Sequence, residues 1–247
     1  MRWLARGETH LPSGSGWLGP FETARVATLR FTKRRTEYLV ARWTAKHALA
    51  RAIGFGEDVD LAALARLEVR NAPTGAPEAY LDGAPLDLPL SLTDRAGWAV
   101  CLVNPGAGAV GIDLEIVEPR TSGFVRDFLT PREQRLVAET ADEDARHLAA
   151  NLVWSAKESA LKVLRTGLRR DTRSVEVTVS LDQPAGEWAP LQVRSSEGGE
   201  MPGWWRRYGA FILTVASAAP TPPPVAIEEP PTLLSAQPMH TWLGRPV

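Results

Sequence analysis

A short phrase recurs at a fixed interval in this chain, and the repeat restricts its fold more than any other feature. Residues 43–46 read WTAK, and residues 154–157 read WSAK, 111 positions later. The apolar runs GWAVCLV, from Gly97, and GAFILTV, from Gly209, are 112 positions apart. Two separate features at nearly one spacing indicate a duplicated α/β unit whose copies pair about a pseudo-twofold axis. We therefore expect an α+β pseudo-dimer of two similar halves, with a ligand cleft between them.

The composition is that of an ordinary globular protein. The 247 residues are 44% hydrophobic, which is enough for a packed core. Because 28 Lys and Arg oppose 29 Asp and Glu, the chain has no bulk field for nucleic acid or anionic membranes. The N-terminus lacks the apolar core of a secretory signal, and no stretch approaches the roughly 18 to 20 apolar residues of a membrane span. We expect a cytoplasmic protein without nucleic-acid or membrane partners.

Cysteine and histidine usage restricts the metal chemistry that the chain can support. The single cysteine, Cys101, lies in an apolar run and is expected to be a buried strand residue. Four histidines without ligand-like spacing, together with one cysteine, do not suggest a structural zinc site. A bound metal ion must therefore be held by oxygen ligands.

A basic cluster stands beside the first strong helical pattern. Apolar residues at helical spacing predict a helix over about residues 36–53, and Arg42 and Lys46 lie on it. Lys33, Arg34 and Arg35 fall just before this helix, where backbone N–H groups and the helix dipole favour an anion. The cluster is either a solvated basic face or a phosphate-binding site.

A pair of carboxylates marks the strand at residues 109–117, which reads AVGIDLEIV. Asp113 and Glu115 are two positions apart and therefore point to the same side, opposite the alternating apolar residues. Adjacent carboxylates repel each other unless a cation or a donor lies between them. The pattern is compatible with a polar outer face, or with a site for a hard divalent cation such as magnesium.

The stretch at residues 151–164, NLVWSAKESALKVL, predicts an amphipathic helix that carries Lys157, Glu158 and Lys162 among apolar residues. Glu158 and Lys162 are four positions apart, so they lie one turn from each other on the same edge. Alone, this spacing is typical of an exposed ion pair. Beside other acids, it suits phosphate and metal chemistry.

The remaining chain is read from its turn and strand signals. Residues 98–103 predict a central strand after a turn at residues 94–97, and residues 124–137 predict two helices separated at Thr130 and Pro131. Of the 28 residues from 220 to 247, eight are proline and no apolar period remains. We expect this tail to be disordered or loosely attached.

Two motifs together resemble a known family. GIDLE at residues 111–115, followed by WSAKESALK at residues 154–162, is similar to the paired signature of 4'-phosphopantetheinyl transferases of the surfactin-synthetase-activating type. The resemblance covers roughly residues 20–219 and also includes KRRTEYLVARWTAK and LSLTDRAGWAV. It implies a pseudo-dimeric fold with an N-terminal half at 1–108, a C-terminal half at 109–219, and the Pro-rich tail at 220–247 outside both.

The family transfers the phosphopantetheine arm of coenzyme A to a serine of an acyl or peptidyl carrier protein and releases adenosine 3',5'-bisphosphate. Carried over by position, the resemblance implies magnesium held by Asp113, Glu115 and Glu158. It implies that Glu158 also accepts the serine proton and that Lys162 stabilises the phosphate of the leaving group. Lys157 falls on the lysine of the motif and is included among the catalytic residues.

Coenzyme A binding is expected at the basic cluster and at residues 91–95. The resemblance implies that the 3'-phosphate is received by Lys33, Arg34, Arg35, Arg42 and Lys46. Where the family often has Ser-x-Ser-His in contact with the pyrophosphate, this chain reads Ser-Leu-Thr-Asp. Thr93 and Arg95 are therefore expected at the pyrophosphate, with Arg95 as the cation in place of histidine and Asp94 opposing binding. A frequent Gly-Lys-Pro motif is replaced by Gly-Ala-Pro at residues 75–77.

Alternatives to an active transferase follow from those departures. The first is a non-catalytic protein that binds coenzyme A or a carrier protein and regulates assembly. The second is a magnesium-dependent phosphoesterase that acts on a nucleotide, with water as the nucleophile. The favoured prediction is a monomeric transferase that serves carriers of fatty acid, polyketide or non-ribosomal peptide synthesis.

Overall fold

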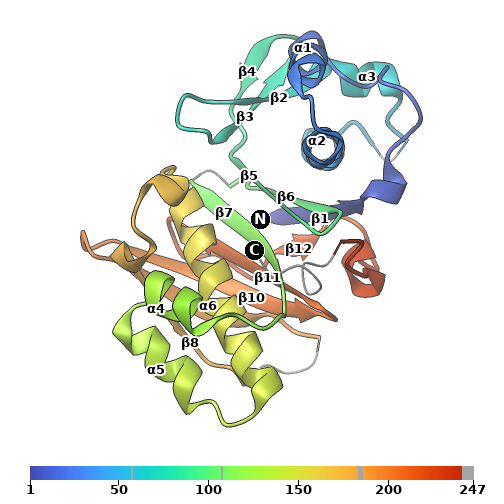
Figure 1. Cartoon of the computed structure of the whole chain (residues 1–247). Helices are drawn as coiled ribbons and strands as arrows, with labels where there is room; N and C mark the ends of the chain where they lie inside the picture. The colour runs from blue at the N-terminus through green and yellow to red at the C-terminus, as the bar shows by residue number, and fades with distance from the viewer. Residues whose placement is uncertain (57, 107, 183–185, 241–247) are drawn as a thin grey trace.

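The structure, a computed structural model, describes residues 1–56, 58–106, 108–182 and 186–240. Within these residues the chain has a mixed α/β fold, with a four-stranded sheet, a five-stranded sheet and a small three-stranded sheet (Figure 1). In this part of the chain no helix combines the length and the apolar character needed to cross a membrane. The predicted mixture of helices and strands is confirmed.

The N-terminal part is built around one long helix, α2 (Thr32–Ala52). Alanines and Leu49 on α2 pack into one core with residues of the four-stranded sheet on one side and of the small sheet on the other (Figure 1). The four-stranded sheet has the order β12-β1-β6-β5, and the small sheet has the order β2-β3-β4. Their bounds are β1 (Arg2–Gly7), β2 (Leu67–Asn71), β3 (Pro77–Leu81), β4 (Ala84–Leu86), β5 (Leu90–Arg95), β6 (Trp98–Val103) and β12 (Val225–Ala226). Shorter helices complete this part: α1 (Pro20–Thr28), α3 (Leu61–Arg66) and the 3-10 turn η1 (Glu8–His10).

The C-terminal part is built around another long helix, α6 (Glu143–Val163), which lies across the five-stranded antiparallel sheet (Figure 1). The strand order is β7-β11-β10-β9-β8. The strands are β7 (Val110–Ile116), β8 (Val175–Val179), β9 (Ala189–Ser195), β10 (Glu200–Tyr208) and β11 (Phe211–Ser217). The remaining helical elements are α4 (Ser122–Phe128), α5 (Pro131–Glu139), η2 (Gly167–Arg169), η3 (Thr172–Ser174) and η4 (Thr232–Ser235).

The two larger sheets meet along β5 and β7 through side-chain hydroxyls. Ser91 Oγ accepts the backbone N–H of Ile112 at 3.1 Å, and Thr93 Oγ1 accepts that of Leu114 at 3.2 Å. Apolar residues of β1, β6, β7 and β11 form one buried cluster across this joint. The first acid-bearing strand of the C-terminal part is thereby held against the N-terminal part.

Gly111 allows α6 to lie close to β7. A Cβ atom added at Gly111 would stand 1.9 Å from the backbone oxygen of Ser159 and 3.1 Å from Lys162 Cβ. Only a residue without a side chain permits this approach. The contact brings one turn of α6, with Glu158 and Lys162, directly over the strand that carries Asp113.

Each long helix buries a lysine that is paired with a glutamate. Lys46 of α2 forms an ion pair with Glu22, and Lys157 of α6 forms one with Glu133 at 2.8 Å; all four side chains are fully buried. Both glutamates stand in the first turn of a helix that begins with proline, and both accept a backbone N–H from a neighbouring strand, Val69 for Glu22 and Val177 for Glu133. The shared phrase WxAK therefore marks the same packing arrangement in both parts.

Several sequence predictions need correction at their boundaries. The strand at 98–103 and the two helices on either side of Thr130 are confirmed. The helix expected over residues 36–53 begins earlier, at Thr32, so Lys33, Arg34 and Arg35 lie inside its first turn rather than before it. β7 is buried on both sides, so Asp113 and Glu115 do not lie on a solvated outer face.

The expectation of a disordered tail is wrong for residues 220–240. Val225 and Ala226 pair in parallel with Arg2 and Trp3 of β1. Arg6 donates to both carboxylate oxygens of Glu228, and Leu233 is fully buried. Proline removes backbone donors but does not prevent such side-chain and edge contacts. Residues 241–247 lie outside the described part of the chain.

Candidate active site

Asp113 of β7 is held by three donors, one from β5 and two from α6. Lys162 Nζ lies 2.8 Å from Oδ1, Thr93 Oγ1 donates to Oδ1 at 3.1 Å, and Ser155 Oγ donates to Oδ2 at 2.9 Å. Lys162 also donates to the backbone oxygen of Ile112 at 2.7 Å. β5, β7 and α6 therefore converge on one buried carboxylate. Of the predicted residues, Thr93, Asp113 and Lys162 are brought together as expected.

Glu115, on the same strand, is held by a separate set of donors. Trp154 Nε1 donates to Oε1 at 2.9 Å, and Arg120 donates to Oε2 at 3.0 Å. Arg95 Nε lies 3.1 Å from Oε2, and Arg95 also donates to Glu118 at 2.6 Å. Arg95 and Arg120 thus both bridge Glu115 and Glu118, since Arg120 lies 3.6 Å from Glu118. Arg95 meets carboxylates of the protein rather than open solvent.

Glu158 differs from the other two acids because one of its oxygens has no partner. Oε1 is buried and makes no hydrogen bond in the structure. Burial, together with the Asp113 and Glu115 carboxylates and against the opposing charge of Lys162, raises the pKa of Glu158 from 4.5 to about 7. Burial, followed by the Asp113 charge, also raises the pKa of Glu115. The negative charges of the three acids therefore repel one another.

Whether a cation fits here follows from charge and from geometry. Three mutually repelling carboxylates, with one unpartnered buried oxygen, are the donor set that a hard cation prefers. In the described residues, however, no three His, Cys, Asp or Glu side chains already form a ligand set. Asp113 and Glu115 instead accept hydrogen bonds from protein donors. The site fits a divalent cation by charge, and its acids must exchange some of these donors to ligate one.

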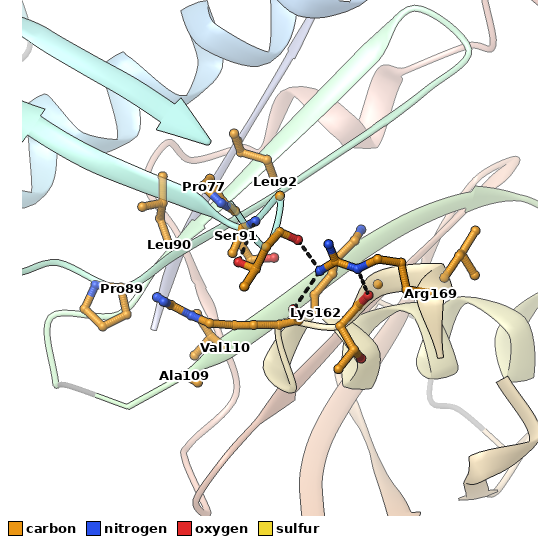
Figure 2. Close-up of a pocket in the computed structure, with 16 residues that line it drawn as sticks. Pro77, Pro89, Leu90, Ser91, Leu92, Ala109, Val110, Lys162 and Arg169 are labelled. Atoms are coloured by element: carbon orange, nitrogen blue, oxygen red, sulfur yellow. Dashed lines mark hydrogen bonds between the residues drawn. The ribbon is translucent and has the colours of Figure 1, made fainter. Parts of the chain in front are cut away.

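A pocket of about 610 Å³ opens beside this cluster (Figure 2). One wall comes from β5 and the turn at residues 74–77, and the opposite wall comes from Lys162 and the segment that follows α6. Ser91 and Leu92 face Lys162 and Arg169 across it. Lys162 lines the pocket and also donates to Asp113, so this side chain connects the pocket wall with the acid cluster.

A second pocket, of about 720 Å³, lies on the N-terminal side. Arg34, Arg42, Glu37 and Asp94 are among the residues that line it. Arg42 is nearly buried, donates to the backbone oxygen of Val69 and to Asn71, and lies over the ring of Tyr38. Asp94 is exposed. The pocket therefore presents cations, with two acids at its edge.

The basic cluster is only partly gathered around this pocket. Lys33, Arg34 and Arg35 are exposed in the first turn of α2. Glu37 lies 3.8 Å from Lys33 and 3.4 Å from Arg34. Arg34 and Arg42 line the pocket, whereas Lys33 and Arg35 are not among its lining residues.

Two predicted site residues are wrong. Lys46, expected at the 3'-phosphate, is fully buried, pairs with Glu22 and donates to the backbone oxygen of Trp17. Lys157, expected among the catalytic residues, is also fully buried and donates to the backbone oxygens of Thr172 and Val175. Helical spacing places Lys157 about 100° from Glu158, so the two side chains leave α6 in different directions. Both lysines stabilise the core instead of meeting a ligand.

Three residues of the site were not predicted. Ser155 and Trp154 stand in the WSAK phrase, but Trp154 was assigned to the apolar side of the helix. Arg120 follows Glu118 and Pro119 in an irregular segment and donates to Asn151 of α6 at 2.6 Å. An arginine close behind the acid pair was the available signal for Arg120, since buried carboxylates need donors.

Comparisons with known proteins agree with this geometry. A model described as the 4'-phosphopantetheinyl transferase superfamily matches residues 109–196, which include Asp113, Glu115, Glu158 and Lys162. A holo-[acyl-carrier-protein] synthase of Acidovorax sp. (strain JS42) is 34% identical over 96 residues, which are 35% of this chain and 73% of that protein. One of Leptothrix cholodnii is 33% identical over 96 residues, 35% of this chain and 72% of that protein.

The chain therefore belongs to the 4'-phosphopantetheinyl transferase superfamily. It is a phosphopantetheinyl transferase, and the expectation of an enzyme is confirmed.

Proposed function

We propose that the protein transfers the 4'-phosphopantetheine arm of coenzyme A to a serine of an acyl or peptidyl carrier protein and releases adenosine 3',5'-bisphosphate. The observation that carries this proposal is Glu158, a buried acid with an unpartnered oxygen and a pKa of about 7, beside Asp113 and Lys162. A carboxylate with a pKa near the working pH is suited to accept a proton from an attacking hydroxyl. The holo-[acyl-carrier-protein] synthases among its relatives support a carrier protein as the acceptor.

The reaction is an in-line displacement at the phosphorus that bears the pantetheine arm. The serine oxygen forms a bond to this phosphorus, and the bond to the oxygen of the adenosine 3',5'-bisphosphate breaks. Glu158 accepts the serine proton, and Lys162 neutralises charge on the departing phosphate. Ser155 and Thr93 fix Asp113, so the acid cluster keeps its geometry while charge develops.

Magnesium dependence is part of the proposal. Asp113, Glu115 and Glu158 would hold the ion, because they form the acid cluster with an unpartnered oxygen. Bound there, magnesium would supply positive charge to the pyrophosphate. In the absence of the ion, the positive charges of Lys162 and Arg95 balance the Asp113 and Glu115 carboxylates that they contact.

The 3'-phosphate of coenzyme A is proposed to bind at Arg34 and Arg42 in the N-terminal pocket, with Lys33 and Arg35 adding charge around its entrance. Arginine suits this role because its guanidinium presents several donors in one plane. Asp94, at the edge of this pocket, opposes an anion and should weaken binding.

A member of the surfactin-synthetase-activating type is the proposed subclass. Support comes from the repeated arrangement of Lys46 with Glu22 and of Lys157 with Glu133, each tied to a strand. Such a correspondence at a spacing of 111 positions favours a duplicated unit, and hence a pseudo-dimer within one chain.

The test is to incubate the protein with coenzyme A, magnesium and a panel of apo carrier proteins, and to follow the carrier mass. A gain of one phosphopantetheine arm is expected with wild type. Glu158→Gln should lower the rate by about 10² to 10⁴-fold, with an unchanged circular dichroism spectrum. No gain on any carrier would contradict the proposal. Coenzyme A binding without transfer would instead support the non-catalytic alternative, to which Asp94 points.

A further inference from the structure

The turn between β5 and β6 carries two residues in the left-handed backbone region. Ala96 has a φ of 51° and Gly97 a φ of 85°. Alanine is rarely found in this region, because its Cβ atom crowds the backbone there. A turn with this conformation persists when neighbouring contacts hold it.

Those contacts come from the C-terminal segment. The backbone N–H of Met239 donates to the Ala96 oxygen at 2.9 Å, and Trp98 Nε1 donates to the Gln237 oxygen at 2.9 Å. The Met239 side chain lies so close that a Cβ atom added at Gly97 would be 2.8 Å from it. Residues 237–239 therefore cover the turn from one side and bond to both of its ends.

Arg95 is the residue immediately before this turn, and it reaches into the active site. Its guanidinium lies 3.1 Å from Glu115 and donates to Glu118 at 2.6 Å. Because Arg95 is joined directly to the turn, a shift of the turn changes the position from which its guanidinium reaches Glu115. Glu115 in turn accepts the indole N–H of Trp154 on α6.

We propose that residues 237–239 are positioning residues for the active site, which act through the Ala96–Gly97 turn to hold Arg95 on Glu115. None of them touches the acid cluster. The proposal rests on the assignment of Glu115 to the reaction, whereas the contact chain from Met239 to Trp154 is independent of that assignment. Part of the tail that the sequence predicts to be disordered thus has a positioning role for the active site.

Two variants test this chain of contacts. Met239→Ala removes the side chain against Gly97, and a protein that ends after Ala236 removes all three residues. Leu234→Ala is the matched control, because Leu234 is in the same segment and 51% exposed, and the three atoms nearest an added Gly97 Cβ all belong to Met239. The readout is the indole ¹H–¹⁵N resonance of Trp154, assigned by its loss in Trp154→Phe, together with kcat and KM for transfer.

We expect the Trp154 resonance to shift in both variants and kcat to fall about tenfold with KM for coenzyme A within about threefold, since misplaced catalytic groups mainly affect the chemical step. Leu234→Ala should change neither. In an Arg95→Ala background, Met239→Ala should cause no further loss, because the pathway is already interrupted. The proposal would be overturned if the Trp154 resonance did not shift, or if Met239→Ala lowered kcat in the Arg95→Ala background as much as it does in wild type. If wild type transfers nothing, the resonance still decides the positioning, while the proposed function fails separately.

Discussion

Glu115 and Glu158 are both buried glutamates of one cluster, and their hydrogen bonds give them different properties. Glu115 accepts from Trp154 and Arg120 and lies beside Arg95, and these three donors oppose the rise in its pKa that burial and the Asp113 charge cause. Glu158 has one oxygen without any donor. The same residue type is therefore a carboxylate held by several donors in one position and a titrating group near neutral pH in the other.

This difference predicts a pH-dependent stability. The pKa of Glu158 is raised from 4.5 to about 7 in the folded protein, so the folded state holds a proton that the unfolded state releases between these values. The stabilisation is fully present below pH 4.5 and is lost as pH rises through 7. In EDTA, Glu158→Gln should therefore gain stability relative to wild type, by up to about 3 kcal/mol, as pH rises from 5 to 8. Urea unfolding of both proteins at the two pH values measures this gain.

A constant difference between the two proteins across this pH range would show that Glu158 is solvated like a surface acid. Added magnesium should reduce the gain of Glu158→Gln, because an ion held by the acids stabilises the ionised wild type.

At the scale of an element, two consecutive residues of α6 lie in different surroundings, one in the core and the other in the acid cluster. Lys157 points to Glu133 and the strand side, and Glu158 points to Asp113 and the cleft. The sequence correctly predicted the helix and the acid, since both depend on local spacing. The sequence did not show that Lys157 is a core residue and Glu158 a site residue. The partner of Lys157 lies on α5, and the pattern of α6 alone does not reveal it.

Lys157→Met should therefore destabilise the protein without acting on the chemistry. Removing one partner leaves Glu133 buried and unpaired, at a cost of about 3 to 5 kcal/mol in chemical unfolding. Glu133→Gln combined with Lys157→Met should recover part of this loss. For the fraction that remains folded, kcat should stay within about threefold of wild type; a larger fall in kcat would restore Lys157 to the catalytic residues.

Gly111 is the second determinant at this scale, because it sets the distance between α6 and β7. Gly111→Ala should force the helix away from the strand and cost at least about 2 kcal/mol, together with loss of the Lys162 to Asp113 contact. Gly199→Ala is the control, since a Cβ atom there meets nothing within 4 Å. Thermal unfolding and the transfer rate measure the two effects. Equal stability of both variants would contradict the close packing of α6 on β7.

At the scale of the whole molecule, the two larger sheets are joined by hydroxyls of β5 that bond to the backbone of β7. This joint is connected to the acid cluster, because Thr93 bonds both to Leu114 and to Asp113. The halves are therefore not independent: a movement at the joint changes the acid cluster.

Ser91→Ala tests the joint without removing a residue that touches Asp113. The backbone N–H of Ile112 would lose its acceptor while it remains buried, at a cost of about 1 to 3 kcal/mol. Hydrogen exchange at the Ile112 amide should accelerate more than at other amides of β7. Ser235→Ala, which removes an exposed hydroxyl far from the joint, should leave this exchange unchanged. No acceleration in Ser91→Ala would mean that the joint is held by apolar contacts alone.

Prediction from sequence reached its limit at contacts between distant segments. The repeat, the acid pair on β7 and the acid of α6 are local patterns, and they indicated both the fold class and the residues around Asp113. Glu115 is fixed by Arg120, in the irregular segment after β7, and by Arg95, at the end of β5; these contacts depend on how the segments pack together, and no periodicity marks them. The tail was misjudged for the same reason: proline content describes the backbone alone, whereas Glu228 and Leu233 are fixed by partners in β1 and in the core.

The pairing of β12 with β1 also has a consequence for biosynthesis. A ribosome makes residues 2–7 well before their outer neighbours at residues 225–226, because most of the described chain lies between them. During that interval the outer edge of β1 presents unpaired N–H and C=O groups to the cell, as any incomplete sheet does. This sheet therefore stays incomplete until residues 225–226 have been made, and a nascent chain that stalls before them is exposed to intermolecular strand pairing along this edge.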